Sequence, residues 1–367
     1  MQKASGIAGS ERHLLALLPV LAQSGVEVRM LVLASGDFQR FLTPLTDAGI
    51  DTATIPAGPD VNPLLIARVT QEVKRYRPDI VHTHLIHGDV YGQLAAAIAG
   101  PRGVSSVHST PSFARKQPYL AALRRAHRRA KRTIAISEHV RRFLTDLRIA
   151  KPEAVRVVHY GIDSSEWVLG DAERVRAREE LGVKAGEVAI GMAARLVPIK
   201  GHDLLLDAFA QAIPRAGSLR LLLAGDGPLR QSLERKANEC FRGDSVRFVG
   251  HLRNLTPFMN ACDLMVFPTE APGEGFGLAA LEAMAASRPV IATAVGAFPE
   301  IVKEGETGYL IVPGARKELA QALVALGKDP ALRARLGSSG RLRAKQAFSL
   351  QTMADRTLSV YREAIVN

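Results

Sequence analysis

The sequence predicts an α/β protein built from two Rossmann-like domains, and three observations lead to this. Short apolar runs alternate with amphipathic helical patterns along almost the whole chain. The alternation occurs twice, before and after the segment Gly161-Ile162-Asp163. A chain of 367 residues is also long enough for two domains with separate cores. Strands separated by helices form parallel sheets covered on both faces, so a ligand is expected at the carboxyl ends of the strands.

The first half is expected to form the N-terminal domain, residues 1–160. Strands are expected at 26–33, 51–55, 79–84, 104–108, 133–136 and 155–158, and helices between them at 38–47, 64–76, 87–99 and 119–130. No apolar run precedes the glycine-containing segment 6–12 and its helical pattern. The first strand of this domain is therefore expected to be missing, with the chain start placed too late or truncated.

The second half shows the same alternation of strands and helices and is expected to form a domain at 161–348. Strands are expected at 188–193, 219–224, 246–249, 264–267, 290–293 and 309–312, and helices at 204–213, 229–240, 255–261, 278–286 and near 298–302. A last helix, within 349–367, follows this domain.

Charge is the unusual feature of the composition, because the formal net charge is +12. Segment 115–142 holds ten basic residues and a single acid, Glu138. This segment predicts reversible docking to an anionic membrane, although a solvated basic face would look the same. A nucleic-acid partner is not expected, because aromatic residues make up only 5% of the chain and no stacking platform is visible.

Targeting and redox signals are weak in this sequence. No apolar run is long enough to span a bilayer and no signal segment is visible, so a cytoplasmic protein is expected, at most peripheral at the inner face of the membrane. Two cysteines without a spacing pattern argue against a disulfide framework or a zinc site.

The most informative stretch is residues 268–282, a glycine-rich loop between a predicted strand and a predicted helix. Backbone N–H groups at a helix N-terminus favour anions, and Gly275 and Gly277 allow a ligand to approach closely. Two carboxylates, Glu274 and Glu282, are suited to bind neighbouring hydroxyls of a sugar or ribose. Read singly, Glu274 would be an acid favoured by the dipole of the helix, and Glu282 would be a solvated residue on that helix.

Two cations follow the first strand of the second domain, in A-R-L-V-P-I-K-G. Arg195 and Lys200 are spaced to clamp a diphosphate, whereas alone they would be ordinary surface cations. Gly225 and Asp226 end the next strand, where a tight turn with a capping aspartate explains them equally well.

Histidines gather in the first domain. His82, His84 and His87 look like metal ligands, but a strand turns the first two to one face with no fixed third ligand, so no metal site is expected. The chain also has no Asp-x-Asp motif. His84 ends one predicted strand and His108 ends another.

The motif E-G-F-G-L-x3-E, followed by A-M-A-A-S-R-P-V-I-A-T-A-V-G-A-F-P-E-I-V, resembles the E-x7-E region of the retaining nucleotide-sugar glycosyltransferases of family 4, which have the GT-B fold. The resemblance runs from about Glu187 to the C-terminus and more loosely back to Gly9. It implies two domains facing a cleft, with the final helix crossing back to the first. It also implies transfer of a hexosyl group, with retention, to a glycan or lipid-linked acceptor in bacterial envelope polysaccharide, lipopolysaccharide or glycolipid synthesis. No cofactor or metal is implied, and a UDP-sugar is the leading donor.

The resemblance also assigns roles to residues. Arg195 and Lys200 would contact the donor phosphates, Glu274 would orient sugar hydroxyls and Glu282 would hold the ribose. Four backbone N–H groups would complete the donor site, those of Gly275, Phe276, Gly277 and Leu278. Four residues would lie near the base or ribose of the donor: Gly225, Asp226, His251 and Leu252. Gly9 and His108 would lie at the cleft that holds the donor sugar.

The chain departs from the family pattern at two points. Ala8-Gly9-Ser10-Glu11 stands where the family has G-G-x-E, and Tyr160 replaces the asparagine of the N-G-[VI]-D linker. Two other functions stay open from the sequence. One is another GT-B activity, such as a sugar-nucleotide epimerase or a phosphorylase. The other is a non-catalytic or truncated basic protein that binds membrane or nucleic acid.

Overall fold

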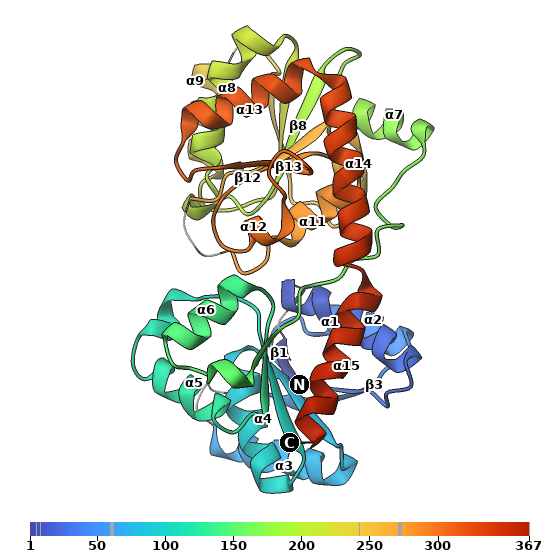
Figure 1. The fold of residues 1–367 in the computed structure, drawn as a ribbon, viewed down its shortest axis with the longest axis vertical. Coiled ribbons are helices and arrows are strands. Elements are labelled where there is room, and N and C mark those ends of the chain that lie inside the picture. Colours follow the sequence, from blue (N-terminus) through green and yellow to red (C-terminus); the bar gives the residue numbers. More distant parts are fainter. Residues whose placement is uncertain (5, 8, 59–61, 242, 271–273, 367) are drawn as a thin grey trace. The chain divides into compact units, whose positions relative to one another are not determined.

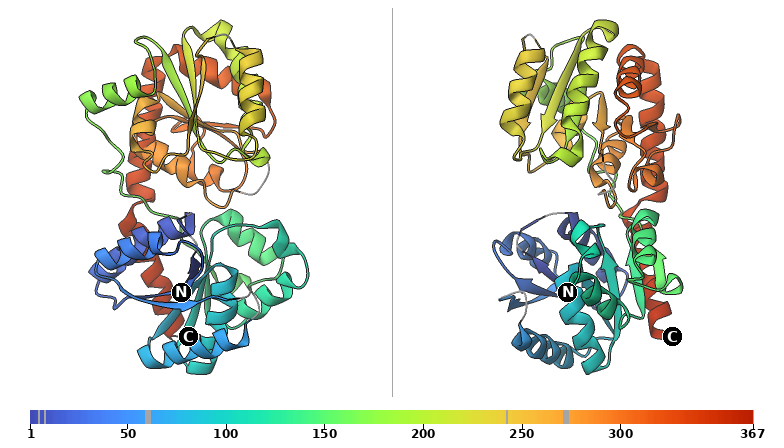
Figure 2. Two further views of the ribbon diagram at one scale, coloured as in Figure 1. Left: turned by 180° about the vertical axis from the view of Figure 1, so that it is seen from behind. Right: turned by 90° about the vertical axis from the view of Figure 1, so that its left-hand side faces the viewer.

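The structure is a computed structural model that describes residues 1–367 apart from 5, 8, 59–61, 242, 271–273 and 367. The chain divides into two compact units, each described by itself below. Unit 1 is Met1–Gly161 with Leu350–Asn367, and unit 2 is Ile162–Ser349. In each unit, helices lie on both faces of one parallel sheet (Figures 1 and 2). The predicted α/β class with two Rossmann-like domains is confirmed.

Unit 1 contains a seven-stranded sheet in the order β3-β2-β1-β4-β5-β6-β7. The strands are β1 (Gln2–Ala4), β2 (Arg29–Ala34), β3 (Asp51–Pro56), β4 (Ile80–His84), β5 (Arg102–Val107), β6 (Arg132–Ala135) and β7 (Val155–Val157). The order reverses at β1 and β4, so the carboxyl ends of these two strands form the switch point of the sheet.

The prediction that the first strand is missing is wrong. Gln2–Ala4 pairs in parallel with β2, and Gln2 also aligns with His84 of β4. Hydrophobic periodicity could not detect this strand because it has only three residues and two of them are polar. Gln2 is fully buried because its side-chain amide donates hydrogen bonds to Ser10 and Glu11 in the first turn of α1 (Gly9–Gln23).

Two hydrophobic cores hold the helices of unit 1 against its sheet. One lies between the sheet and α1, α2 (Gln39–Asp47) and α15 (Leu350–Val366), and the other between the sheet and α3 (Pro63–Tyr76) and α4 (Leu85–Ala99). Val32 enters the first core and Leu33 the second, as the alternation of side chains along a strand requires. The remaining α-helices of this unit are α5 (Tyr119–His127) and α6 (Glu138–Asp146).

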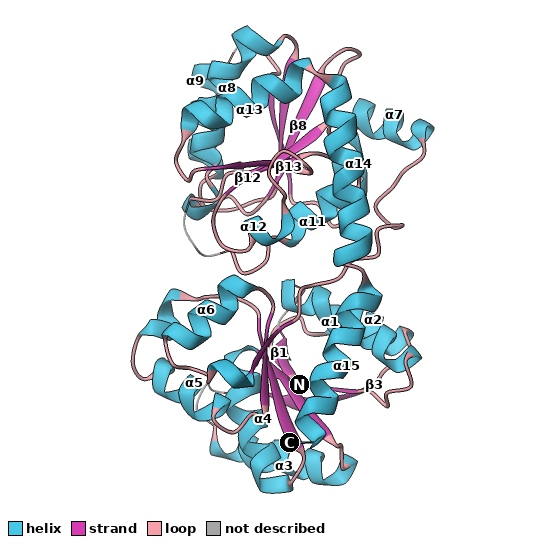
Figure 3. Ribbon diagram, viewed as in Figure 1, coloured by secondary structure: helices cyan, strands magenta, loops and turns pink. Residues whose placement is uncertain are grey.

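Unit 2 contains a six-stranded sheet in the order β10-β9-β8-β11-β12-β13. Its strands are drawn in magenta among cyan helices in Figure 3. Its strands are β8 (Val188–Ala193), β9 (Leu219–Ala224), β10 (Val246–Gly250), β11 (Leu264–Phe267), β12 (Val290–Thr293) and β13 (Gly308–Ile311). Its α-helices are α7 (Asp171–Glu180), α8 (His202–Ala216), α9 (Arg230–Cys240), α10 (Thr256–Ala261), α11 (Leu278–Ala285), α12 (Phe298–Ile301), α13 (Arg316–Lys328) and α14 (Pro330–Ala347). Here the order reverses between β8 and β11.

Three short 3-10 helices complete the description, at Ser112–Arg115, Pro152–Ala154 and Pro198–Lys200. Over the described part of the chain, none of the helices combines the length and apolar character that crossing a membrane would need.

Candidate active site

The switch point of unit 2 brings together two charged residues predicted from the sequence. Lys200 ends the 3-10 helix that follows β8, and Glu274 lies in the loop that follows β11. The Lys200 Nζ atom lies 2.5 Å from Oε2 of Glu274, and the two side chains are 24% and 19% exposed. An ammonium and a carboxylate therefore lie side by side at the carboxyl edge of the sheet, within reach of solvent.

Close backbone contacts hold the two loops together. The amide of Glu270 donates a hydrogen bond to the carbonyl of Ile199 at 3.0 Å. Gly201 has a φ of +74°, and a Cβ there would lie 1.9 Å from the carbonyl oxygen of Pro268. The position of Lys200 thus depends on a backbone approach that only glycine permits.

The N-terminus of α11 begins just beyond these loops. Gly277 caps the helix with a φ of +92°, and a Cβ there would lie 2.6 Å from the ring of Phe298. The amides of Ala280 and Leu281 donate to the carbonyl of Gly277, so an anion would be received by the N–H groups that precede them at the start of the helix. Gly275 and Phe276 are buried, Leu278 is half-buried, and Ala271, Pro272 and Gly273 of the predicted loop lie outside the described residues.

Glu282 lies in the interior of α11 and is only 3% exposed. A carboxylate this deeply buried needs polar partners to remain charged. Its position one helical turn inside α11 keeps it close to the N–H groups at the start of that helix.

The loops after β8, β9 and β10 also hold one another at this edge. The amide of Leu196 donates a hydrogen bond to the carbonyl of Asp226 at 2.9 Å. The amide of Gly225 donates one to the carbonyl of Gly250 at 2.7 Å. The side chains of Arg195, Asp226 and His251 are exposed, and Leu252 is half-buried. Apart from Glu282, which lies inside α11, the predicted residues of the second domain therefore lie on loops or helix starts that follow strands of one sheet.

Unit 1 holds a group of four histidines, here called the histidine cluster: His13, His82, His84 and His108. They come from α1, from β4 and from the residue that follows β5. The rings of His82 and His84 are 4.2 Å apart, those of His84 and His108 are 5.1 Å apart and those of His13 and His108 are 5.5 Å apart. The sequence identified His108 and His84, but not the participation of His13.

Hydrogen bonds link the cluster to two tyrosines. Nδ1 of His84 lies 2.9 Å from Nε2 of His108, and Nδ1 of His108 lies 2.6 Å from the hydroxyl of Tyr160. The nitrogens of His82 lie 2.8 Å from the hydroxyls of Tyr361 and Ser106. The ring of Tyr160 stacks on His13 at 4.5 Å.

Burial keeps these imidazoles neutral. It lowers the pKa of His108 to about 3, and it lowers the pKa values of His13, His82 and His84 well below the usual range. Repulsion between the rings, which would be cations if protonated, acts in the same direction for His13, His82 and His84. Neutral imidazoles can donate and accept hydrogen bonds at the same time, which allows these rings to bond to one another and to the neighbouring hydroxyls.

Gly9 begins α1, at the same edge of the unit 1 sheet, and Ala8 lies outside the described residues. Glu11, the acid of the predicted loop, is 5% exposed and accepts hydrogen bonds from Gln2 and Ser10. It thus acts in holding β1 to α1.

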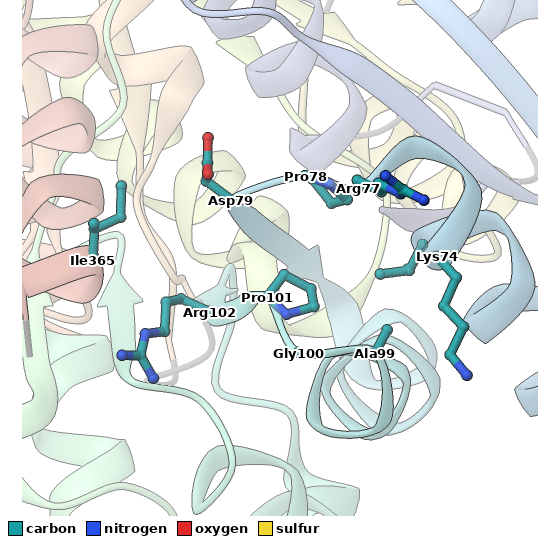
Figure 4. A pocket seen from close by; sticks show the side chains of 10 residues that line it. Lys74, Arg77, Pro78, Asp79, Ala99, Gly100, Pro101, Arg102 and Ile365 are labelled. Carbon is teal, nitrogen blue, oxygen red and sulfur yellow. The ribbon is translucent and has the colours of Figure 1, made fainter.

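A surface hollow of about 810 Å³ lies elsewhere on unit 1, at the amino ends of β4 and β5 (Figure 4). Lys74, Arg77 and Arg102 line it together with Asp79 and Ile365. The heads of Lys74 and Arg102 point away from each other in Figure 4. Nothing predicted from the sequence lies here, and the ends of strands that usually bind ligands are at the opposite edge of the sheet.

His82, His84 and His87 lie within six residues of one another in the sequence. Over the described residues, no group of three or more His, Cys, Asp or Glu side chains is arranged to hold a metal ion. His87 instead lies with its Nε2 3.5 Å from Nζ of Lys3.

Comparison with known proteins relates both halves of the chain to glycosyltransferases. Residues 173–343 match the family model described as "Glycosyl transferases group 1", and residues 7–166 match "Glycosyltransferase Family 4". The D-inositol 3-phosphate glycosyltransferases of Saccharomonospora viridis and Rhodococcus erythropolis are each 30% identical to this chain. The alignments cover 94% and 95% of this chain and 86% and 84% of those proteins.

Solved structures agree with this relationship. HepE from Anabaena in complex with UDP has a TM-score of 0.86 at 25% identity, and the alignment covers 98% of this chain and 97% of HepE. The complex of HepE with UDP-glucose has a TM-score of 0.83 at 27% identity and covers 97% of both chains. A glycosyltransferase from Rickettsia africae, 20% identical with a TM-score of 0.84, covers 100% of this chain and 98% of its own and shares the fold. The chain is therefore a glycosyltransferase, a member of the group 1 and family 4 glycosyltransferases with the GT-B fold.

Proposed function

We propose that this enzyme transfers a hexosyl group from a UDP-sugar, with retention of anomeric configuration, to a hydroxyl of a glycan or lipid-linked acceptor. The observation that carries the proposal is the contact between Lys200 and Glu274 beside the N-terminus of α11. A cation and helix N–H groups suit a diphosphate, and the carboxylate suits sugar hydroxyls. The HepE complexes with UDP and UDP-glucose support the choice of donor.

In the proposed reaction, Lys200 and Arg195 stabilise the charge that develops on the departing diphosphate, and Glu274 orients the sugar. Glu282 holds the ribose, and the loops carrying Asp226 and His251 bind the base. The acceptor oxygen attacks the face from which the diphosphate leaves, and a phosphate oxygen takes the acceptor proton. Placed charge of this kind is usually a large term in catalysis.

The nature of the acceptor has a second candidate. The curated relatives from Saccharomonospora and Rhodococcus are named for D-inositol 3-phosphate, a phosphorylated polyol. Analysis of the reaction products distinguishes directly between a soluble polyol phosphate and a lipid-linked or glycan acceptor. We expect envelope polysaccharide or glycolipid synthesis to be the setting if the lipid-linked acceptor is used.

Glu282→Gln is expected to weaken binding of the UDP-sugar about tenfold or more. The change keeps the size of the side chain but removes the negative charge that accepts hydrogen bonds from two ribose hydroxyls, and a hydrogen bond to a charged group is worth roughly 1.5–3 kcal/mol. Calorimetric titration of UDP-, GDP- and ADP-sugars into both proteins, in EDTA, measures the loss and identifies the base. We expect EDTA to leave binding and turnover unchanged.

The matched control for this experiment is Glu239→Gln, the same chemical change at an exposed position of α9. It should bind the donor like the parent protein. Equal binding by Glu282→Gln and the parent would remove Glu282 from the proposed donor site. Turnover that stops in EDTA and returns with a divalent cation would contradict a metal-independent reaction.

We also propose that the basic segment 115–142 docks on anionic membrane. Part of its charge serves the fold, since Arg124 donates to the carbonyl of Leu147 and Arg132 pairs with Glu363. Arg125 of α5 and Arg128, the residue that caps its C-terminus, remain exposed. Beside that helix, the rings of Phe113 and Tyr119 pack edge-to-face 5.4 Å apart and are 42% and 49% exposed as residues. A segment that carries both exposed cations and exposed aromatic rings suits the interface of an anionic bilayer.

Arg125→Glu combined with Arg128→Glu should reduce binding to vesicles containing anionic phospholipid by at least about 30-fold, since each cation near the surface contributes roughly 1 kcal/mol. Co-sedimentation with vesicles of neutral and mixed neutral–anionic lipid measures this. Arg235→Glu combined with Lys317→Glu changes the net charge equally at exposed positions of unit 2. If both double variants lose binding alike, overall charge and not this segment is responsible.

A further inference from the structure

Tyr160 is a departure of this chain from its family, because it replaces the usual asparagine of the linker motif. The residue is 4% exposed, and its ring stacks on His13 with 22° between the ring planes. Its hydroxyl lies 2.6 Å from Nδ1 of His108. A buried tyrosine with its hydroxyl on an imidazole nitrogen controls which nitrogen of that ring carries the proton.

The hydrogen bonds form a chain of three rings. Tyr160 contacts Nδ1 of His108, and Nε2 of His108 contacts Nδ1 of His84. Both nitrogens of His108 are therefore used inside unit 1. Over the described part of the chain, Nε2 of His84 has no hydrogen-bond partner, and His84 ends β4 at the switch point of the sheet.

This chain can run in two directions. In one, the Tyr160 hydroxyl donates to His108, Nε2–H of His108 donates to His84, and the proton of His84 is on Nε2. In the other, Nδ1–H of His84 donates to His108, which donates to the oxygen of Tyr160, and Nε2 of His84 carries only a lone pair. His84 is a hydrogen-bond donor in the first case and a base in the second.

The first direction is the stronger one. An imidazole nitrogen accepts a hydrogen bond better than a phenol oxygen does, and a phenol is the better donor. Burial, reinforced by the charge of Glu11, raises the pKa of Tyr160, so its hydroxyl keeps its proton. Burial also keeps both histidines neutral, which leaves each ring a single proton to place.

We propose that Tyr160 is a positioning residue that fixes the tautomers of His108 and His84, so that Nε2–H of His84 is offered as a hydrogen-bond donor to an oxygen of the acceptor substrate. The inference rests on the proposed function, because it takes the acceptor substrate to be a compound with hydroxyl groups or the phosphate of such a compound. It assigns His84 to binding and not to proton removal. A phosphate oxygen of the donor therefore remains the group that takes the acceptor proton.

Tyr160→Phe tests the proposal because it removes the hydroxyl and keeps the stack on His13. We label the histidines of the full chain with ¹⁵N and record long-range ¹H–¹⁵N correlations at pH 7.5, with assignments from single histidine substitutions. The parent protein should show His84 and His108 protonated on Nε2. The variant should show His108 shifted towards the Nδ1–H form. Acceptor kcat/KM should fall about tenfold, as when an outer hydrogen bond to a functional histidine is lost.

Tyr361→Phe is the matched control. Tyr361 makes the equivalent contact with Nδ1 of His82, at 2.8 Å, in the same cluster. Its loss should leave the tautomers of His84 and His108 and the acceptor kcat/KM unchanged. The two variants together separate a defined proton position from a general disturbance of the cluster.

Two results would overturn the proposal. One is a parent protein in which His84 carries its proton on Nδ1. The other is a tautomer shift in Tyr160→Phe without a change in acceptor kcat/KM, because Tyr160 would then act only in the fold. If the parent transfers no sugar from any nucleotide donor, the proposed function fails by itself, while the NMR measurement still decides the tautomers.

Discussion

Lys200→Ala should lower kcat/KM for sugar transfer by about 10²–10³-fold, with most of the loss in kcat. Removing one preorganised group that stabilises developing charge in an active site typically has this effect. Lys200 is placed for such a role by the close approach of Gly201 to Pro268 and by its contact with Glu274. Steady-state kinetics with the UDP-sugar chosen by the titrations measures the loss.

Lys236→Ala provides the control for this experiment. Lys236 lies in α9 of the same unit and pairs with Asp203 and Asp207. The variant therefore loses a lysine and its ion pairs without touching the loops of the candidate site, and its kcat/KM should stay within about twofold of the parent. If Lys200→Ala were as active as Lys236→Ala, the assignment of the diphosphate site would be wrong.

Acidification should destabilise unit 1 strongly, by up to about 7 kcal/mol between pH 7.5 and 5.5. Burial lowers the pKa of five of its histidines, His13, His82, His84, His108 and His127. In the unfolded chain these residues bind protons below a pH of about 6.5, whereas in the folded unit they stay neutral. Their contribution to stability is therefore complete above that pH and is lost as the pH falls.

Other charges modify this expectation. Asp89 lies 3.8 Å from Nε2 of His127, and burial raises the pKa of Asp89, which opposes part of the acid effect. Unit 2 provides an internal control, because burial lowers the pKa of His202 to about 4 but His251 is exposed. Amide hydrogen exchange of the full chain, corrected for the intrinsic pH dependence, should show a much larger loss of protection in β4 and β5 than in β8 and β9. Equal losses in both units would contradict the prediction.

Much of the fold could be predicted because most elements carry a regular pattern. The strand at Leu264–Phe267 and the helix that starts at Leu278 were predicted at their observed positions, since an apolar run and a glycine punctuate them. Helix ends were less predictable. The pattern extended one helix to Ala130, whereas α5 ends at His127, because the carbonyls there are taken up by a tighter turn.

The failure at β1 has a different physical origin. Hydrophobic patterns report burial of apolar side chains, but Gln2 is buried through hydrogen bonds to residues eight and nine positions away. Only a three-dimensional arrangement reveals such compensation. The hydrophobic pattern therefore missed β1, in which the polar residue Gln2 enters the core.

Candidate site residues divide in the same way. A local motif was enough to select Lys200 and Glu274, which lie 74 positions apart and are in contact. The link between Tyr160 and His108 was not predicted, because neither spacing nor composition indicates a hydrogen bond across 52 positions. The signal that was present, a tyrosine in place of the family asparagine, marked the position without indicating its partner.

The assignment of α15 to unit 1 affects the order in which a ribosome can complete the two units. Unit 2 is one continuous stretch of chain and can fold as soon as it has emerged. The core of unit 1, in contrast, combines Ala4 and Leu14 with Met353, Val360 and Ala364. The half of the protein that is synthesised first is thus the half that is finished last. Until α15 arrives, the nascent chain carries an open apolar surface on its first sheet, the kind of surface that chaperones bind.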